Sequence, residues 1–173
     1  MTVTTNSNKK NIRVAIAGLG AIGKSLSTHL ASGAIPGVVL TAVSAKDHQK
    51  AQEFVKTLAH SVKLLKIEDL EPEADVVVEC APANLLGDII TPFLKNQKRA
   101  IVLSVGAILF RPDLVELAKE TGGVIMVPTG ALIGLDAMVA AAEGNIHSVR
   151  MITRKPPKGL EGAPHLIEHH ISV

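Results

Sequence analysis

The sequence predicts an α/β protein built on a doubly wound parallel sheet. Short apolar runs alternate with segments of helical periodicity about ten residues long, the pattern expected of strand–helix–strand units. Apolar residues make up 47% of the 173 residues, yet there are only three Phe and no Trp or Tyr. Such an aliphatic core is common where strands are buried on both faces. Because parallel crossovers are right-handed, few other arrangements are open to this order of elements.

The expected strands are residues 12–17, 38–44, 62–67, 75–80, 100–105 and 124–127. The expected helices between them are residues 21–32, 47–59, 84–95 and 112–121. Asp47 is a residue type that caps helix N-termini, so we expect it to cap the second helix.

The sequence predicts three regions along the chain. A polar, flexible tail covers residues 1–11, and a first domain covers 12–130, by which point six strands have been used. Residues 131–173 are expected to begin a second, α+β domain with a helix over 131–143 and a strand over 146–153.

Charge and composition argue against several classes of protein. The net charge is +2, from 18 Lys+Arg and 16 Asp+Glu, and no basic stripe is interleaved with aromatics, so no nucleic-acid partner is expected. The longest apolar run, residues 100–110, is broken by Ser104 and Gly106 and is too short to span a membrane. The single cysteine, Cys80, suits a reducing compartment, and residues 1–10 lack the apolar stretch of a signal peptide. We therefore expect a cytoplasmic protein.

A glycine-rich turn follows the first expected strand and satisfies two nucleotide-binding motifs at once. Gly18, Gly20 and Gly23 fit G-x-G-x-x-G, whereas the stretch from Gly18 to Ser25 fits the P-loop pattern G-x-x-x-x-G-K-S. Both motifs place backbone N–H groups at a helix N-terminus, where the helix dipole favours phosphate. A tight turn with a purely structural role is the third interpretation.

The helical register favours the dinucleotide motif of the Rossmann fold. Ile22 is spaced with Leu26 and Leu30, which implies that the helix has already begun at Ile22 and that the turn is short. A P-loop protein also needs an Asp at the end of another strand to hold magnesium, and the strand over 75–80 offers only Glu79. We therefore predict that this domain binds NAD or NADP.

The end of the second strand bears on the choice between the two cofactors. An acidic residue there selects NAD by binding the ribose 2′-hydroxyl. This chain has the uncharged Ser44, followed by Lys46, which could meet a 2′-phosphate. NAD and NADP both stay open, and Ser44→Asp is expected to penalise NADP.

Five segments, in chain order, resemble the L-aspartate dehydrogenase family. They are GLGAIG from Gly18, VVVECAPA from Val76, SVGA from Ser104, PTGALIGLDA from Pro128 and TRKPPKGLEGAP from Thr153. The last two are the most specific. The resemblance implies a homo-oligomeric enzyme that oxidises L-aspartate, or a similar small amino acid, to iminoaspartate with NAD or NADP, a product that can feed NAD biosynthesis.

The resemblance also implies which residues contact the cofactor. Those against the pyrophosphate would be Gly18, Gly20, Ala21, Ile22 and Gly23, and those on the nicotinamide side would be Cys80, Ala81, Ser104 and Gly106. Ala131 matches a cofactor-binding alanine of the family. The sheet rule agrees, because ligands of open α/β sheets bind beyond the carboxyl ends of the strands.

No catalytic residue is carried over, because the family's catalytic histidine and a further cofactor-binding asparagine correspond to positions beyond Val173. We therefore expect a truncated second domain, which in the family is catalytic and oligomeric, and negligible aspartate turnover by these 173 residues. The alternative is a dinucleotide-binding module without turnover, and a third interpretation changes the substrate to homoserine or a related amino acid.

Other candidate residues have simpler explanations. His165 and His169 fit the zinc pattern H-x-x-E-H, but such a site needs a third ligand and only four residues follow, so no metal is expected. His147 is interpreted as a surface histidine and Cys80 as a small packed thiol. The basic stretch 155–158 fits a dicarboxylate site and a rigid proline loop equally well.

Overall fold

The structure is a computed structural model, and it describes residues 11–130, 134–152, 154, 156, 157, 160 and 164–172. The chain divides into two compact units, Met1–Gly130 and Ala131–Val173. No helix among the described residues is long and apolar enough to cross a membrane.

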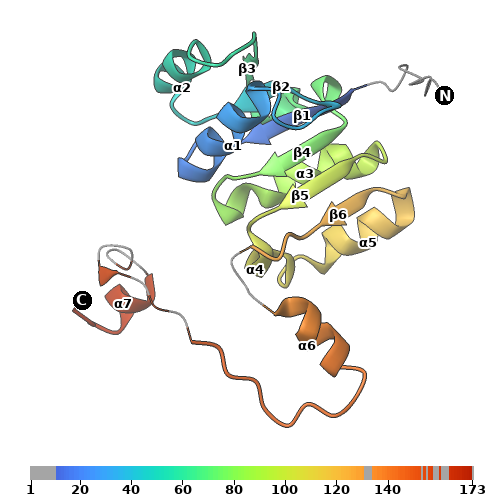
Figure 1. The fold of residues 1–173 in the computed structure, drawn as a ribbon, viewed down its shortest axis with the longest axis vertical. Coiled ribbons are helices and arrows are strands. Elements are labelled where there is room, and N and C mark those ends of the chain that lie inside the picture. Colours follow the sequence, from blue (N-terminus) through green and yellow to red (C-terminus); the bar gives the residue numbers. More distant parts are fainter. Residues whose placement is uncertain are drawn as a thin grey trace, which may run out of the picture. The chain divides into compact units, whose positions relative to one another are not determined.

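The first unit is built on a six-stranded sheet in the order β3-β2-β1-β4-β5-β6, in which every neighbouring pair is parallel (Figure 1). The strands are β1 (Ile12–Ala17), β2 (Val38–Ser44), β3 (Lys63–Leu65), β4 (Val76–Glu79), β5 (Arg99–Val102) and β6 (Val124–Met126). The chain winds outward from β1 to β3, then returns to β4 on the other side of β1. This confirms the doubly wound parallel sheet that the sequence predicts, with its switch point between β1 and β4.

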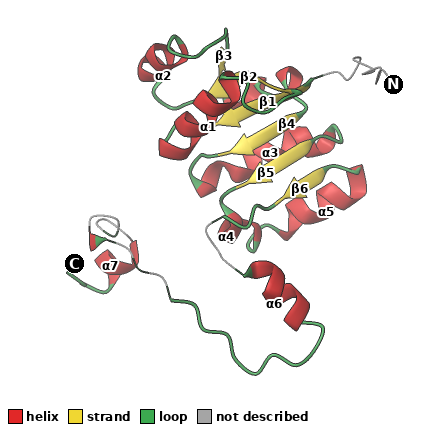
Figure 2. Cartoon of the chain, viewed as in Figure 1, coloured by secondary structure: helices red, strands yellow, loops and turns green. Residues whose placement is uncertain are grey.

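Helices cover both faces of the sheet (Figure 2). The α-helices of this unit are α1 (Ala21–Ala31), α2 (His48–Val55), α3 (Leu86–Lys95), α4 (Val105–Ile108) and α5 (Pro112–Thr121). The 3₁₀ turns are η1 (Ile67–Asp69), η2 (Glu71–Glu73) and η3 (Ala83–Leu85).

The core consists of two clusters, one on each face of the sheet. On one face, small strand residues such as Ala15 and Ala100 lie under Phe93 of α3 and Leu114 of α5. On the other face, larger strand residues such as Ile16 pack with residues of α1 and α2. Alternate residues of a strand point to opposite faces, so the two clusters share the same strands. The core is aliphatic, as predicted, and Phe93 is among its largest buried side chains.

Several predicted boundaries shift, and one shift has a clear physical cause. The strand expected over 100–105 ends at Val102, and α4 begins at Val105. Between them, the backbone N–H groups of Leu103 and Ser104 donate to the carboxylate of Glu79 at 3.1 and 2.8 Å. These donors are therefore satisfied by a side chain instead of by a further step of the sheet ladder.

The second unit contains α6 (Leu135–Ala141) and α7 (Pro164–Glu168). The strand expected over 146–153 is wrong over its described residues, because 146–152 form no strand. Ile152 is 73% exposed. An isolated strand leaves its backbone donors and acceptors unpaired, and the described part of this unit supplies no partner strand. The start of the helix expected over 131–143 lies outside the described residues.

The close packing of α1 on the end of β1 predicts unequal effects of two glycine substitutions. A Cβ on Gly23 would lie 1.9 Å from the carbonyl oxygen of Gly18, whereas a Cβ on Gly20 would meet nothing within 4 Å. We expect Gly23→Ala to lower the free energy of unfolding by at least about 2 kcal/mol through overpacking. Gly20→Ala should cost less than about 1 kcal/mol, as a change at a helix N-cap. Urea denaturation measures both, and equal losses would contradict this packing.

Candidate dinucleotide-binding site

The turn after β1 is held from two sides. Gly18 has a φ of +103°, a conformation that favours glycine, and its N–H donates to the carbonyl oxygen of Ser44 at 2.8 Å. A Cβ on Gly18 would lie 2.5 Å from the carbonyl oxygen of Cys80. The turn therefore fits between the ends of β2 and β4, at the switch point of the sheet.

The helix that follows, α1, begins at a glycine. Gly20 is the N-cap of α1 and makes no side-chain capping bond. The bond from Lys24 N to Gly20 O, at 3.0 Å, belongs to the first turn of the helix. The first N–H groups of an α-helix have no partner within the helix, and the helix dipole favours an anion beside them. Since nothing lies within 4 Å of a Cβ on Gly20, a phosphate could approach this backbone closely.

This geometry supports the dinucleotide interpretation of the motif over the P-loop. Ala21 and Ile22 already belong to α1, so the residues that would wrap a phosphate in a P-loop are helical here. Ile22 belongs to α1, as its spacing predicts, but it is 63% exposed. Helical spacing located the start of the helix but not the face that packs on the sheet. That face carries Ser27 and Leu30, which are buried.

A cleft of about 1100 Å³ opens beside the glycine turn, slightly larger than the ~300–1,000 Å³ usual for small-molecule sites. The residues predicted from the sequence that line it are Gly18, Gly20, Ser44, Cys80 and Ala81.

The other predicted residues lie elsewhere. Ala21 and Ile22 line a separate apolar groove beside α1, so only their backbone belongs to the helix N-terminus. Gly23 is buried behind Gly18. Ser104 and Gly106 follow β5 but are not among the residues that line the cleft. Ala131 lies outside the described residues.

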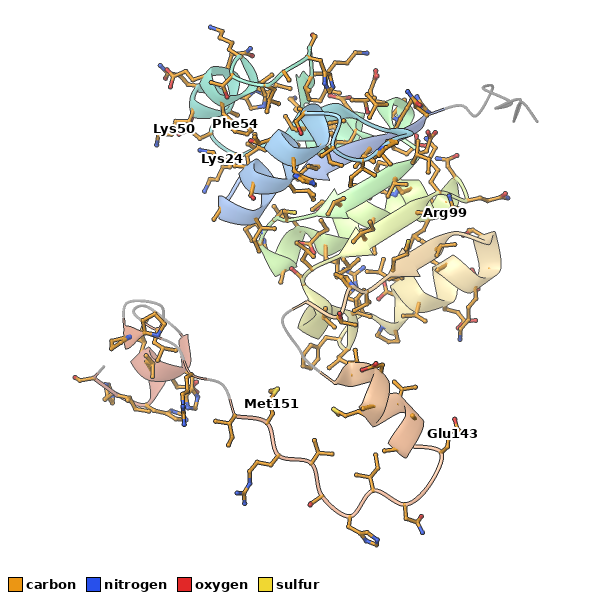
Figure 3. All side chains as sticks on the ribbon, in the orientation of Figure 1. Lys24, Lys50, Phe54, Arg99, Glu143 and Met151 are labelled. Atoms are coloured by element: carbon orange, nitrogen blue, oxygen red, sulfur yellow. The ribbon has the colours of Figure 1, made fainter. Side chains whose placement is uncertain are left out.

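The side of the cleft near β2 is basic. Its lining includes four lysines and two carboxylates, namely Lys24, Lys46, Lys50, Lys66, Asp47 and Glu68. The Lys24 ammonium lies 5.6 Å from the centre of the Phe54 ring, and Figure 3 shows these two side chains between α1 and α2. This excess of positive charge suits a ligand that carries phosphates.

Asp47 is committed to its helix. Its Oδ1 accepts from the backbone N–H of Lys50 at 3.0 Å, which confirms the predicted cap, and its Oδ2 lies 3.1 Å from the Lys50 ammonium. The backbone hydrogen bond from Lys50 is the main reason why the pKa of Asp47 is lowered. The Asp47 carboxylate, which follows β2 in the chain, is thus already paired.

Cys80 has the properties of a packed thiol and not of a nucleophile. Burial is the main cause that raises its pKa to about 11, with the charge of Glu79 adding to the effect. At neutral pH the group is therefore a protonated thiol, whereas nucleophilic cysteines need a lowered pKa.

Sequence reasoning missed the role of Glu79, which it weighed only as a magnesium ligand. This last residue of β4 is fully buried, and its carboxylate accepts four hydrogen bonds from the segments that follow β4 and β5. One donor is the hydroxyl of Ser104, at 3.0 Å, so that predicted site residue is bonded to the protein itself.

The histidine pair that fits a zinc motif makes a ring contact. The rings of His165 and His169 meet edge to face, with centroids 4.1 Å apart. Among the described residues, no group of three or more His, Cys, Asp or Glu side chains is arranged to hold a metal ion.

A parallel sheet with an uncapped, glycine-built helix N-terminus at its switch point defines the class of this protein as an NAD(P)-binding α/β domain. Comparison with known proteins supports the same class. The chain belongs to the family described as "Homoserine dehydrogenase, NAD binding domain", whose model matches residues 18–128.

Two curated relatives confirm the resemblance to L-aspartate dehydrogenase. The chain is 48% identical to "L-aspartate dehydrogenase 3" of Bordetella bronchiseptica over 96% of its own length and 61% of the relative's. It is 47% identical to "L-aspartate dehydrogenase" of Bradyrhizobium diazoefficiens over 99% of its own length and 60% of the relative's. The chain thus spans about 60% of the length of these relatives.

A solved structure of aspartate dehydrogenase from Thermotoga maritima shares the fold. It superposes with a TM-score of 0.54 and 24% identity, over 77% of this chain and 52% of that one.

The lysine at the end of β2 predicts the response of cofactor preference to charge. Ser44 is only 4% exposed, so Ser44→Asp would bury a carboxylate, and the exposed Lys46 is the better position to change. We expect NADP to bind within about tenfold of NAD. Lys46→Glu should weaken the binding of NADP by about tenfold relative to that of NAD, because the new carboxylate repels the 2′-phosphate. Fluorescence titration with NADH and NADPH measures the ratio of the two dissociation constants.

Lys56→Glu is the matched control, since Lys56 is exposed at the far end of α2 and does not line the cleft. The same change of ratio in both variants, or in neither, would show that Lys46 does not face the ribose.

Proposed function

We propose that this chain is the NAD(P)-binding part of an enzyme that oxidises L-aspartate, or a similar small amino acid, to the imino acid. The observation that carries the proposal is the open space over Gly20 at the uncapped N-terminus of α1. The substrate is supported by the names of the relatives that are 48% and 47% identical. The imino product could feed NAD biosynthesis.

In this proposal the backbone of the glycine turn binds the pyrophosphate. The N–H groups of Ala21, Ile22 and Gly23 point along the helix axis toward the anion, Gly18 makes the bend, and Gly20 leaves room for the phosphates. Ser44, together with the lysines beside it, meets the adenosine ribose.

The nicotinamide half would lie toward the ends of β4 and β5. Cys80 and Ala81 line that part of the cleft, and Ser104 and Gly106 follow the neighbouring strand. When bound, the cofactor accepts the hydride that leaves the substrate Cα, while a base takes the proton from the amine. Because the Cys80 thiol stays protonated, it is not that base.

Residues 131–173 form a separate unit, and we assign them to the start of the catalytic and oligomerisation domain. Ala131, by family resemblance, would add a cofactor contact there. The same resemblance supports a homo-oligomer, which light scattering on the purified protein would test.

A second candidate function is dinucleotide binding without turnover. It is favoured by the make-up of the cleft, because the one imidazole among the described residues that line it, His48, belongs to α2. That helix follows β2, on the adenosine side, so His48 is not placed to act as the base for an amine beside the nicotinamide.

Substitution of Gly20 separates ligand binding from folding. We expect Gly20→Val to raise the Kd of NADH at least about tenfold, because the side chain would fill the space meant for the pyrophosphate. The melting temperature should change little, since nothing lies within 4 Å of that Cβ. Fluorescence titration and circular dichroism measure the two effects, with Gly144→Val in the second unit as the control. Unchanged NADH binding by Gly20→Val would contradict the assignment of the glycine turn.

Turnover distinguishes the two candidate functions. The protein that carries this chain should reduce NAD or NADP, followed at 340 nm, with L-aspartate and not with L-homoserine or L-glutamate. Cofactor binding with no reduction by any of the three would favour the binding module. Faster reduction with L-homoserine would indicate that homoserine is the substrate, and the class of reaction would stay the same.

A further inference from the structure

Glu79 is a fully buried carboxylate at the centre of the sheet's carboxyl edge. It plays no part in the glycine turn and does not line the cleft. Burying a charged group is costly unless hydrogen bonds compensate for the lost water. A buried Glu79 carboxylate therefore depends on the donors around it.

Both carboxylate oxygens of Glu79 are fully used. Oε1 accepts from the backbone N–H of Ala81 at 3.1 Å and from the hydroxyl of Ser104 at 3.0 Å. Oε2 accepts from the backbone N–H groups of Leu103 and Ser104, at 3.1 and 2.8 Å. An ionised carboxylate satisfies all four donors without placing a proton between them, and such charge-assisted bonds are the strong ones.

These bonds replace the sheet ladder just where it stops. β4 ends at Glu79 and β5 ends at Val102, so the N–H groups of Ala81, Leu103 and Ser104 lie beyond the paired strands. The carboxylate gathers these three donors and thereby joins the segment that follows β4 to the segment that follows β5. Without it, three backbone donors near the cleft would lack these partners.

The glycine turn is held by contacts of its own, none of which is made by the Glu79 carboxylate. Gly18 is tied to β2 through its bond to Ser44 O, and Gly23 packs directly on the carbonyl of Gly18. Two parts of the cleft are therefore held by different means. Backbone contacts, including the packing of Gly18 on the Cys80 carbonyl, hold the pyrophosphate side. The Glu79 carboxylate binds Ala81 and joins it to the segment that follows β5.

We propose that Glu79 is a positioning residue for the nicotinamide half of the dinucleotide, acting by fixing the segments 80–81 and 103–104 relative to each other. This inference rests on the proposed dinucleotide function of the cleft. It requires that loss of Glu79 weakens the binding of ligands that carry nicotinamide more than the binding of ligands that lack it. Fixing the surroundings of a bound group before it arrives lowers the cost of ordering them on binding.

Glu79→Gln is the most selective test, because it keeps the volume of the side chain. Its carbonyl oxygen can still accept from Leu103 and Ser104, and the Ser104 hydroxyl can turn to accept from the new amide. The amide NH₂ then faces the N–H of Ala81, so that one link is lost. We expect the Kd of NADH to rise about tenfold and that of ADP-ribose, which lacks nicotinamide, to change less than about twofold, as measured by calorimetry.

Two further variants complete the test. One removes a single hydrogen bond to Glu79, and the other lowers stability without touching Glu79. Ser104→Ala removes one of the four bonds and leaves three, so the ratio of the NADH and ADP-ribose affinities should shift by about twofold to threefold. Leu114→Ala opens a cavity in the core under α5, where Leu114 is 1% exposed and does not line the cleft. It should lower the midpoint of urea unfolding while leaving both affinities as they are.

The outcomes are distinct from those that test the proposed function. If Glu79→Gln weakens the binding of NADH and of ADP-ribose equally, or changes neither Kd, the positioning role would be overturned. Should Glu79→Gln fail to fold, an unshifted affinity ratio in Ser104→Ala would overturn it instead. If the unsubstituted chain binds neither ligand, the dinucleotide function itself is wrong.

Discussion

The contact between Gly23 and the carbonyl oxygen of Gly18 sets the geometry on which the rest of the site depends. A Cβ at Gly23 would lie 1.9 Å from that oxygen, so only glycine lets α1 begin this close to the end of β1. The close approach fixes the direction of α1 and brings its N-terminus to the switch point of the sheet. The open backbone at Gly20 and the cleft beside it follow from this placement.

The charges around the cleft favour a phosphate at its surface. The buried carboxylate of Glu79 does not line the cleft. Lysines outnumber carboxylates in the cleft lining, and Asp47 is paired with Lys50. The carboxylate of Glu79 is buried beneath the strand ends and bonded to four donors. A negative charge so fully hydrogen-bonded organises the backbone near the cleft without adding an unpaired anion to its lining.

Much of the fold and of the glycine turn could be predicted because their causes are local in sequence. Alternating apolar runs and helical spacing located the six strands, and the residue types at Gly18, Gly20 and Gly23 indicated the turn. Asp47 was recognisable as a cap because its partner, Lys50, lies three residues away.

The features that were missed depend on contacts between distant parts of the chain. Glu79 follows three valines, and nothing near it in sequence indicates that three of its four donors lie 24 or 25 residues away. The exposure of Ile22 depends on which face of α1 meets the sheet, a choice that spacing alone leaves open. The strand expected over 146–153 failed for a related reason, since a strand exists only with a partner.

The central claim is that a dinucleotide lies across the carboxyl edge of the sheet with its pyrophosphate over Gly20. A crystal structure of the chain with NADH or NADPH tests it most directly. The account predicts phosphate oxygens within about 3.2 Å of the backbone N–H groups in the first turn of α1, with the nicotinamide toward Cys80 and Ala81. A dinucleotide bound elsewhere, or phosphates that do not contact this turn, would contradict it.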